Sequence, residues 1–307
     1  MRFAISTNWN CHRHKEAGTM FEEIRSLGFD TVELGYETTQ TQLDSLPGLV
    51  GPGGMSVSSV HAFCPNIVVG RGGWELYSPC DPDDFNGSRK AITALARCAE
   101  FAASVGAKAV VLHTGRAPVF EEVRECAAMV ADGLGDTPKY QKRLLRMIEK
   151  RDKLAGPLLD TLYESLEILL PHYAKCGVSL GMENFPTYDG IPNESEMAEL
   201  LREFDDMPLA YWHDLGHGQI RHHHRIANHK AIVSGFRRNI AGFHIHDVIF
   251  PGNDHQLPGV EGGTVDFKLL RPFVDSDVQF VLEPTTAASA QQLAQSLRFL
   301  QEQLSQT

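Results

Sequence analysis

Residues 173–184 read YAKCGVSLGMEN, which is the end of a helical run, a glycine, and a short apolar strand that stops at a carboxylate. A glycine directly after a helix is typical of a left-handed C-cap, which ends the helix before the next strand. The same order occurs in SLGFD at 26–30 and in SVGAK at 104–108. A helix, a glycine and then a strand, repeated along one chain, predicts βα units with parallel strands.

The whole chain follows this alternation of strands and helices. Eight such units in 307 residues predict a single-domain (β/α)8 TIM barrel over residues 1–307. An open doubly wound sheet fits less well, because the first strand leads into STNWNCHRH without the G-x-G-x-x-G turn that cradles phosphates. We expect strands near 2–7, 31–35, 57–62, 109–114, 179–184, 209–214, 240–246 and 279–284, and helices near 16–28, 38–46, 86–105, 156–176, 194–204, 226–238, 266–274 and 288–304.

Two connections are predicted to be long loops, at about 64–85 and about 115–155. The second contains KYQKRLLRMIEKRDK at 139–153, a basic and helix-like run. This run is either the solvated face of a helix or a patch for an anionic ligand. A separate run, RHHHR at 221–225, is expected to be an exposed loop or the start of a helix.

Composition narrows the classes of protein. A formal net charge of −11 disfavours a general polyanion binder, so duplex nucleic acid is not an expected partner. The first residues, MRFAISTNWN, lack the apolar core of a signal peptide, and no run approaches the ~18 apolar residues of a membrane span. The six cysteines form no C-x-x-C pair, as expected for reduced thiols. We therefore predict a cytoplasmic enzyme with no membrane partner; whether it forms a homo-oligomer stays open.

Polar side chains gather at the predicted carboxyl ends of the strands, where barrel enzymes carry their active sites. Carboxylates buried together are costly unless they are paired or bind a metal, and no lysine or arginine occupies these strand ends. Carboxylate and imidazole ligands suit Mn²⁺, Mg²⁺, Zn²⁺ or Co²⁺, so we predict a divalent metal site. Because side chains alternate along a strand, His244 and His246 face the same side. The candidates are Glu33, His61, His113, Glu183, Asp214, His217, His244, His246, Asp254, His255 and Glu283.

With these residues in place, the chain resembles the xylose-isomerase-like TIM barrel superfamily. That group holds sugar and sugar-phosphate isomerases and epimerases, and also AP endonuclease family 2, the endonuclease IV type. The resemblance covers nearly the whole chain and is carried, in order, by GFDTVELG, SVHAF, VVLHTG, GMENF, HDLGH, GFHIHDV and FVLEP. In the epimerase branch one divalent metal is held by Glu, Asp, His and Glu from strands five to eight, which implies the ligands Glu183, Asp214, His244 and Glu283 here.

The strand-seven ligand has two candidates. The resemblance favours His244 over His246, because the family pattern places an acidic residue three after the ligand, and Asp247 matches it.

The endonuclease branch uses more histidines, for a cluster of three zinc ions. By that resemblance two or three zinc ions could bind here, with His61, His113, His217 and His255 as the matching residues and His246 as a further candidate. One ligand departs from the pattern, because the aspartate expected two before His255 is Asn253. The segment after strand two, ETTQTQLDSLPG at 37–48, is acidic and lacks the basic, wedge-bearing character of a DNA-recognition loop.

We therefore predict a divalent-metal-dependent isomerase or epimerase that acts on a small sugar, sugar phosphate or related hydroxy-ketone through an enediolate. By the resemblance, Glu183 and Glu283 are both ligands and acid–base groups, and His217 holds a substrate oxygen. His61, His113 and Arg116 are expected to contact substrate, with Arg116 on a phosphate or hydroxyl group. The alternative is a metal-dependent phosphodiesterase of the endonuclease IV type with a multi-zinc site. Another reaction on the same barrel, such as dehydration, or a non-catalytic binding role is the third hypothesis.

Overall fold

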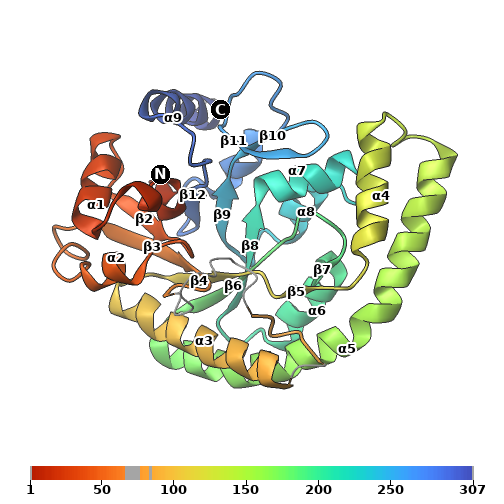
Figure 1. The fold of residues 1–307 in the computed structure, drawn as a ribbon, viewed down its shortest axis with the longest axis horizontal. Helices are drawn as coiled ribbons and strands as arrows, with labels where there is room; N and C mark the ends of the chain where they lie inside the picture. The colour runs from red at the N-terminus through yellow and green to blue at the C-terminus, as the bar shows by residue number, and fades with distance from the viewer. Residues whose placement is uncertain (1, 66–76, 83–84, 306–307) are drawn as a thin grey trace.

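The computed structural model describes residues 2–65, 77–82 and 85–305. Its centre is a closed barrel of eight strands in the order β1-β12-β9-β8-β6-β4-β3-β2, and every neighbouring pair is parallel. Helices surround the barrel (Figure 1). This confirms the predicted single (β/α)8 TIM barrel. The barrel strands are β1 (Ala4–Ser6), β2 (Thr31–Leu34), β3 (Ser56–His61), β4 (Ala109–Leu112), β6 (Ser179–Glu183), β8 (Leu209–Asp214), β9 (Ile240–Ile245) and β12 (Gln279–Leu282).

The glycines that suggested this fold end their helices as expected. Gly28, Gly106 and Gly177 have φ angles of 90°, 76° and 66°, in the left-handed region that favours glycine. Within the described residues, no helix combines the length and apolar character needed to cross a membrane. The helices are α1 (Ala17–Ser26), α2 (Gln40–Asp44), α3 (Phe85–Ser104), α4 (Phe120–Ala131), α5 (Pro138–Cys176), α6 (Glu194–Glu203), α7 (Leu215–His223), α8 (His229–Gly235) and α9 (Ala290–Ser305), with 3₁₀ helices η1 (Thr7–Trp9), η2 (Cys11–Arg13) and η3 (Phe267–Phe273).

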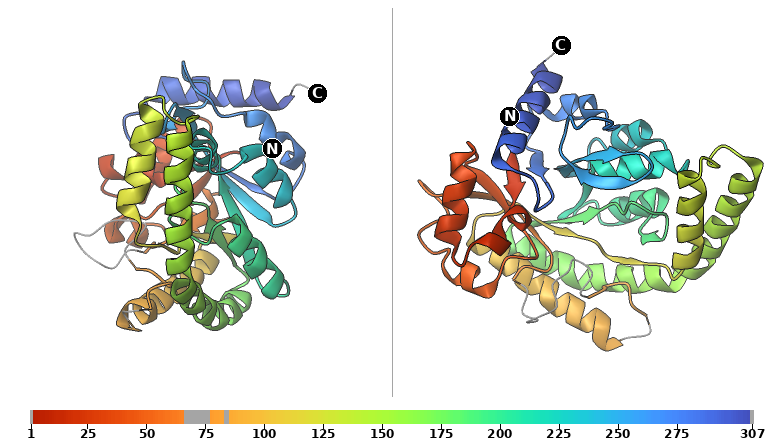
Figure 2. Two further views of the ribbon diagram at one scale, coloured as in Figure 1. Left: turned by 90° about the vertical axis from the view of Figure 1, so that its right-hand side faces the viewer. Right: turned by 45° about the horizontal axis from the view of Figure 1, so that its top comes forward.

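The connection at 115–155 is mostly helical rather than an irregular loop. It holds α4 and the first half of α5, which stand side by side at one edge of the molecule (Figures 1 and 2). We expected a helix to begin at 156, but α5 runs for 39 residues through Gly156 and Pro157. Buried side chains continue on both sides of that pair, so packing outweighs the backbone hydrogen bond that the proline cannot make. Most of the other long connection, at 64–85, lies outside the described residues.

The basic run at 139–153 lies on α5, and three of its cations already have acidic partners, one of them Arg143 with Glu125 on α4. Lys150 Nζ is 2.8 Å from the Glu122 carboxylate on α4. Arg151 is fully buried and bonds the Glu196 carboxylate, with Nη2 at 2.7 Å from Oε2. These contacts support the reading of the run as a helix packed on its neighbours.

Two short antiparallel ribbons extend the chain beyond the barrel strands. One pairs β5 (Gly115–Arg116) with β7 (Gly190–Ile191), and the other pairs β10 (Asp247–Ile249) with β11 (Asn253–Gln256). Strands of two to four residues are too short to show an alternating pattern, so the sequence did not predict them.

The indole of Trp212 fills the barrel interior below the polar strand ends. Two glycines on the flanking strands make room for it: a Cβ at Gly242 would lie 2.2 Å from Trp212 Cζ3, and one at Gly181 would lie 3.2 Å from Cε3. The ring centroid of Trp212 is 5.3 Å from that of His244, in an edge-on arrangement. The indole therefore forms the floor on which the polar strand ends rest. Its other buried neighbours are Ala4, Ala109, Val111 and Val281.

Replacing Gly242 with alanine is expected to destabilise the protein by about 1–3 kcal/mol, because the new methyl group would displace a buried indole in a close-packed interior. Urea denaturation would measure the free energy of unfolding. Gly235→Ala is the matched control, since a Cβ at Gly235 meets nothing within 4 Å. If the two variants unfolded at the same urea concentration, Trp212 would not be held by the absence of a side chain at Gly242.

Candidate metal centre

The carboxyl ends of the barrel strands bring the predicted ligands together. Glu183 ends β6, Asp214 ends β8, His244 lies in β9, and Glu283 directly follows β12. One ligand atom from each of these four residues lies within 4.8 Å of those of the other three. The predicted one-metal ligand set is thus a single cluster in space, which we call the inner group.

Glu33 extends the inner group behind His244. His244 Nδ1 is 2.8 Å from Glu183 Oε1 and 3.6 Å from Glu283 Oε2, whereas Nε2 is 3.1 Å from Glu33 Oε2. Ser59 Oγ donates to the same oxygen of Glu33 at 2.7 Å. A histidine that ligates a metal through one nitrogen usually donates from the other to a carboxylate or carbonyl. With Nδ1 facing the inner group, Glu33 has the position of that supporting carboxylate.

His61 and His113 lie on one side of the inner group. The Oε2 atom of Glu183 is 3.1 Å from His113 Nε2 and 3.4 Å from His61 Nε2. His61 Nδ1 donates to the Ala62 carbonyl at 2.8 Å, so its Nε2 in the neutral ring is a lone pair facing a carboxylate oxygen. Two acceptors at that distance require a proton or a metal ion between them.

His217, His246 and His255 lie on the other side, beyond Asp214. Their ring nitrogens also lie within 4.8 Å of one another. His217 Nδ1 donates to the Asn184 carbonyl at 2.8 Å and His255 Nδ1 to that of Glu283 at 3.3 Å, so both present an Nε2 lone pair.

His246 differs from its two neighbours. The backbone N–H of His255 donates to His246 Nδ1 at 2.9 Å, which leaves the proton on Nε2. That Nε2 donates to the Asp214 carboxylate at 3.0 Å. This geometry makes His246 a support for Asp214 and leaves His244 to face the inner group. Asp247, used in the sequence to choose between the two histidines, lies outside the inner group and accepts backbone N–H groups of Val248 and Thr264 at 2.8 and 2.9 Å.

The charges in the inner group depend on one another. Burial raises the pKa of Glu283 to about 7, although the positive charge of His244 opposes this; the negative charges of Glu183 and Glu33 raise it further. Burial also opposes ionisation of Glu183, yet the positive charges of His113 and His244 hold its pKa well below the usual range. The pKa of His244, which burial would lower, is raised well above its usual value by the three surrounding carboxylates. The carboxylates of Glu33, Glu183 and Glu283 therefore favour a positive charge among them, either on His244 or on a bound cation.

These residues fit a divalent metal ion. Glu33 Oε1 and Glu183 Oε2 are buried without a hydrogen-bond partner among the described residues. In that same part of the chain, the ion pairs of these carboxylates involve histidines and neither lysine nor arginine. Three carboxylates and one imidazole, the donors of the inner group, suit Zn²⁺, Mn²⁺, Co²⁺ or Mg²⁺.

Arg116 lies at the rim, outside the inner group. Its Nη1 donates to Thr187 Oγ1 at 3.0 Å and lies 3.3 Å from Asp189 Oδ2, and its guanidinium sits 4.7 Å from the ring centroid of Phe185. Asp189 is buried, so much of the Arg116 charge is already balanced. This placement is less suited to a phosphate than the sequence suggested, and it leaves a hydroxyl contact available.

A chain of hydrogen bonds behind the site was not predicted. It starts in β8, passes through α7 and α8, and ends at the loop that joins β10 to β11. The expectation that 221–225 is exposed was wrong for three of its five residues, because Arg221 and His223 in α7 and His224 directly after it are buried. The links are Tyr211 Oη to His213 Nδ1 (3.0 Å), His213 Nε2 to His229 Nε2 (3.0 Å), His229 Nδ1 to Gln219 Oε1 (3.1 Å), Gln219 Nε2 to His223 Nε2 (3.0 Å) and His223 Nδ1 to the Pro251 carbonyl (3.1 Å).

The direction of every bond in this chain follows from its ends. Burial lowers the pKa of His213 well below its usual value and that of His229 to about 4, so each ring is neutral and carries one proton. The Pro251 carbonyl can accept only, so His223 donates to it and accepts from the Gln219 amide. His229 then donates to the Gln219 carbonyl, and His213 donates to His229. The Tyr211 hydroxyl donates to His213.

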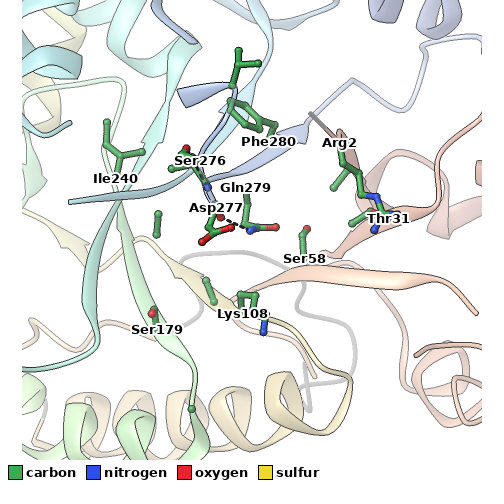
Figure 3. A pocket seen from close by; sticks show the side chains of 16 residues that line it. Arg2, Thr31, Ser58, Lys108, Ser179, Ile240, Ser276, Asp277, Gln279 and Phe280 are labelled. Carbon is green, nitrogen blue, oxygen red and sulfur yellow. Dashed lines mark hydrogen bonds between the residues drawn. The ribbon is translucent and has the colours of Figure 1, made fainter. Parts of the chain in front are cut away.

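Three cavities are relevant to the position of the site. Two adjoin the predicted residues: one of about 550 Å³ has His113 in its wall, and one of about 210 Å³ has His255 and Glu283 in its wall. The largest, about 820 Å³, lies at the opposite end of the barrel, where strands begin (Figure 3). It is lined by residues such as Thr31, Ser58 and Gln279 and contains none of the predicted ligands. The candidate site therefore lies at the carboxyl end, between the two smaller cavities.

Comparisons with known proteins agree with this fold. Similar solved structures include a D-tagatose 3-epimerase-like protein (TM-score 0.69, 18% identity, covering 99% of this chain and 97% of that one) and the 3-keto-D-glucoside 4-epimerase YcjR from E. coli (TM-score 0.67, 18% identity, 98% and 99% covered). Another is the IolI protein with a bound zinc atom (TM-score 0.61, 14% identity, 99% and 98% covered). At these identities the likeness shows the fold alone.

Sequence comparison identifies the family. No curated protein matches the chain. The family profile described as xylose isomerase-like TIM barrel matches residues 21–303, which is most of the sequence. The chain therefore belongs to the xylose isomerase-like TIM barrel family.

Proposed function

We propose that this protein is a divalent-metal-dependent isomerase or epimerase of a small sugar or related hydroxy-ketone. The observation that carries the proposal is the inner group, in which Glu183 and Glu283 approach His244 Nδ1 from different strands, at 2.8 and 3.6 Å. Two carboxylates on separate strands can reach a bound substrate from two directions. The epimerases among the structural neighbours support the choice of reaction class.

The inner group would hold one metal ion through Glu183, Asp214, His244 and Glu283. The bound metal would supply the positive charge that adjacent carbonyl and hydroxyl oxygens need as an enediolate develops. The zinc in the IolI structure supports metal binding by this fold.

The protein's own residues would handle the proton and orient the sugar. One of Glu183 and Glu283 removes a proton from the carbon next to the carbonyl, and the other returns a proton to complete the isomerisation or epimerisation. The Nε2 lone pairs of His217 and His255 can accept hydrogen bonds from sugar hydroxyls, because their Nδ1 protons are engaged with backbone carbonyls. These contacts would orient the substrate for proton transfer.

Glu183→Gln is expected to lose the metal, because an amide ligates a divalent cation more weakly than a carboxylate. Elemental mass spectrometry of the purified protein should find about one Mn, Mg, Co or Zn ion per chain in the wild type. Glu199→Gln, an exposed change on α6, is the control and should keep the metal. A wild-type protein that binds no metal even after re-addition would refute the proposal.

Glu283→Gln should reduce turnover of a responsive ketose by about 10²–10⁴-fold, the usual contribution of a positioned acid–base group. In D₂O the wild type should place solvent deuterium on the carbon next to the carbonyl, and mass spectrometry of the sugar would detect it. Unchanged turnover by Glu283→Gln would remove Glu283 from the reaction.

His255→Ala should raise KM more than it lowers kcat, since His255 is assigned to substrate hydroxyls.

A phosphodiesterase is the second candidate, favoured by the group of His61, His113 and Glu183 beside the inner group. Two or three zinc ions per chain, reduced by His61→Ala, together with cleavage of an abasic-site duplex would support it. A single metal ion and no cleavage would leave the isomerase or epimerase. Two observations count against the phosphodiesterase. Arg116 is already paired with Asp189, and Asn253 stands where the endonuclease pattern has an acidic ligand.

A further inference from the structure

We infer that the cavity of about 550 Å³ beside His113 binds a neutral, apolar substituent of the substrate, so that the preferred substrates are keto sugars that carry a flat apolar substituent rather than phosphorylated sugars. This inference rests on the proposed function for the sugar half of the substrate. The volume lies within the range of about 300–1,000 Å³ that is usual for small-molecule sites.

The cavity adjoins the candidate metal centre at one side chain. His113 lies in its wall, and His113 Nε2 is 3.1 Å from Glu183 Oε2 of the inner group. Thr114, Gly115 and Arg116 continue the wall outward from β4. A substituent held in this cavity would therefore lie one side chain away from the inner group.

The rest of the wall, as far as it is described, is mainly apolar. Phe120 begins α4, and Leu154 and Leu158 lie on α5 opposite it. Phe120 is 59% exposed and Leu154 is 37% exposed. Single exposed apolar residues are common on proteins, but two that share one cavity next to a candidate active site indicate a surface that a ligand covers. Tyr77, Pro82, Pro118 and Pro157 also line the cavity.

Charge separates an apolar group from a phosphate as the occupant. Arg116 is the cation among the described lining residues, and it already pairs with Asp189 at 3.3 Å. Asp81 adds a carboxylate to the same wall. A phosphate bound here would lose water without gaining an unshared cation, whereas an apolar ring loses little on burial.

The cavity on the other side of the inner group is lined mostly by side chains that carry a polar group. It has a volume of about 210 Å³, and its wall holds hydroxyl and amide groups, such as those of Ser6 and Asn8, together with the carboxylates of Glu37 and Glu283. Ser6 Oγ is buried without a hydrogen-bond partner in the described chain. A keto sugar bound there, with its apolar substituent beside His113, would place the reacting carbons between the two cavities, at the inner group.

The test uses 4-fluorobenzyl alcohol, a neutral aromatic probe, and follows its ¹⁹F NMR signal as the protein is titrated. We expect saturable binding to the wild type that Phe120→Ser and Leu158→Ser each weaken by at least about fivefold. Leu145→Ser is the matched control, because Leu145 is also 59% exposed on α5 but does not line the cavity. Inorganic phosphate should not displace the probe.

Three results would overturn the inference: no saturable binding, equal weakening by Phe120→Ser and Leu145→Ser, or displacement of the probe by phosphate. The metal-deficient Glu183→Gln variant separates this inference from the proposed function. Probe binding that persists there, in a protein whose wild type turns over no sugar, would keep the apolar site and reject the isomerase. Turnover of ketoses without probe binding would do the reverse.

Discussion

Several carboxylates are buried at one end of a barrel with few cations near them, and the rest of the site depends on that constraint. Glu33, Glu183 and Glu283 surround one imidazole, and Asp214 lies next to them. Negative charges this close repel strongly where water is excluded, so the fold must supply positive charge or bind it. The histidines around these carboxylates meet this requirement. Backbone carbonyls fix the ring protons of several of them, which turns the other ring nitrogen toward the site.

The barrel makes the arrangement rigid. Parallel strands that end together place their last residues on one rim, and the indole of Trp212 prevents the ligand side chains from collapsing inward. Asn184 links two of the strand ends, since its amide accepts from the backbone N–H of Asp214 at 2.8 Å and donates to the Asp214 carbonyl at 3.1 Å. The ligands therefore sit on strands that are joined to each other above a packed floor.

The sequence predicted the barrel and the inner group well, because both depend on strong local signals. Each strand is an apolar run after a turn, and its last polar residue can be read directly. The sequence failed where the outcome depended on contacts between distant segments. The start of α5 was misplaced because Gly156 and Pro157 look like a helix boundary until both halves are seen to pack on the same neighbours. The sequence favoured His244 over His246 by resemblance alone. The physical basis of that choice is a backbone N–H nine residues after His246, at His255, which no local pattern indicates.

The hydrogen-bond chain from Tyr211 to Pro251 has a mechanical consequence. Because each neutral ring donates on one side and accepts on the other, reversing a single bond would leave two donors or two acceptors in contact, and the Pro251 carbonyl, which can only accept, fixes the direction of the whole chain. These hydrogen bonds connect the loop after β10 to the barrel strand β8, and all of them point in the same direction along the chain. A displacement of Pro251 would be passed along the chain to Tyr211, in the wall of the barrel, as long as every hydrogen bond holds.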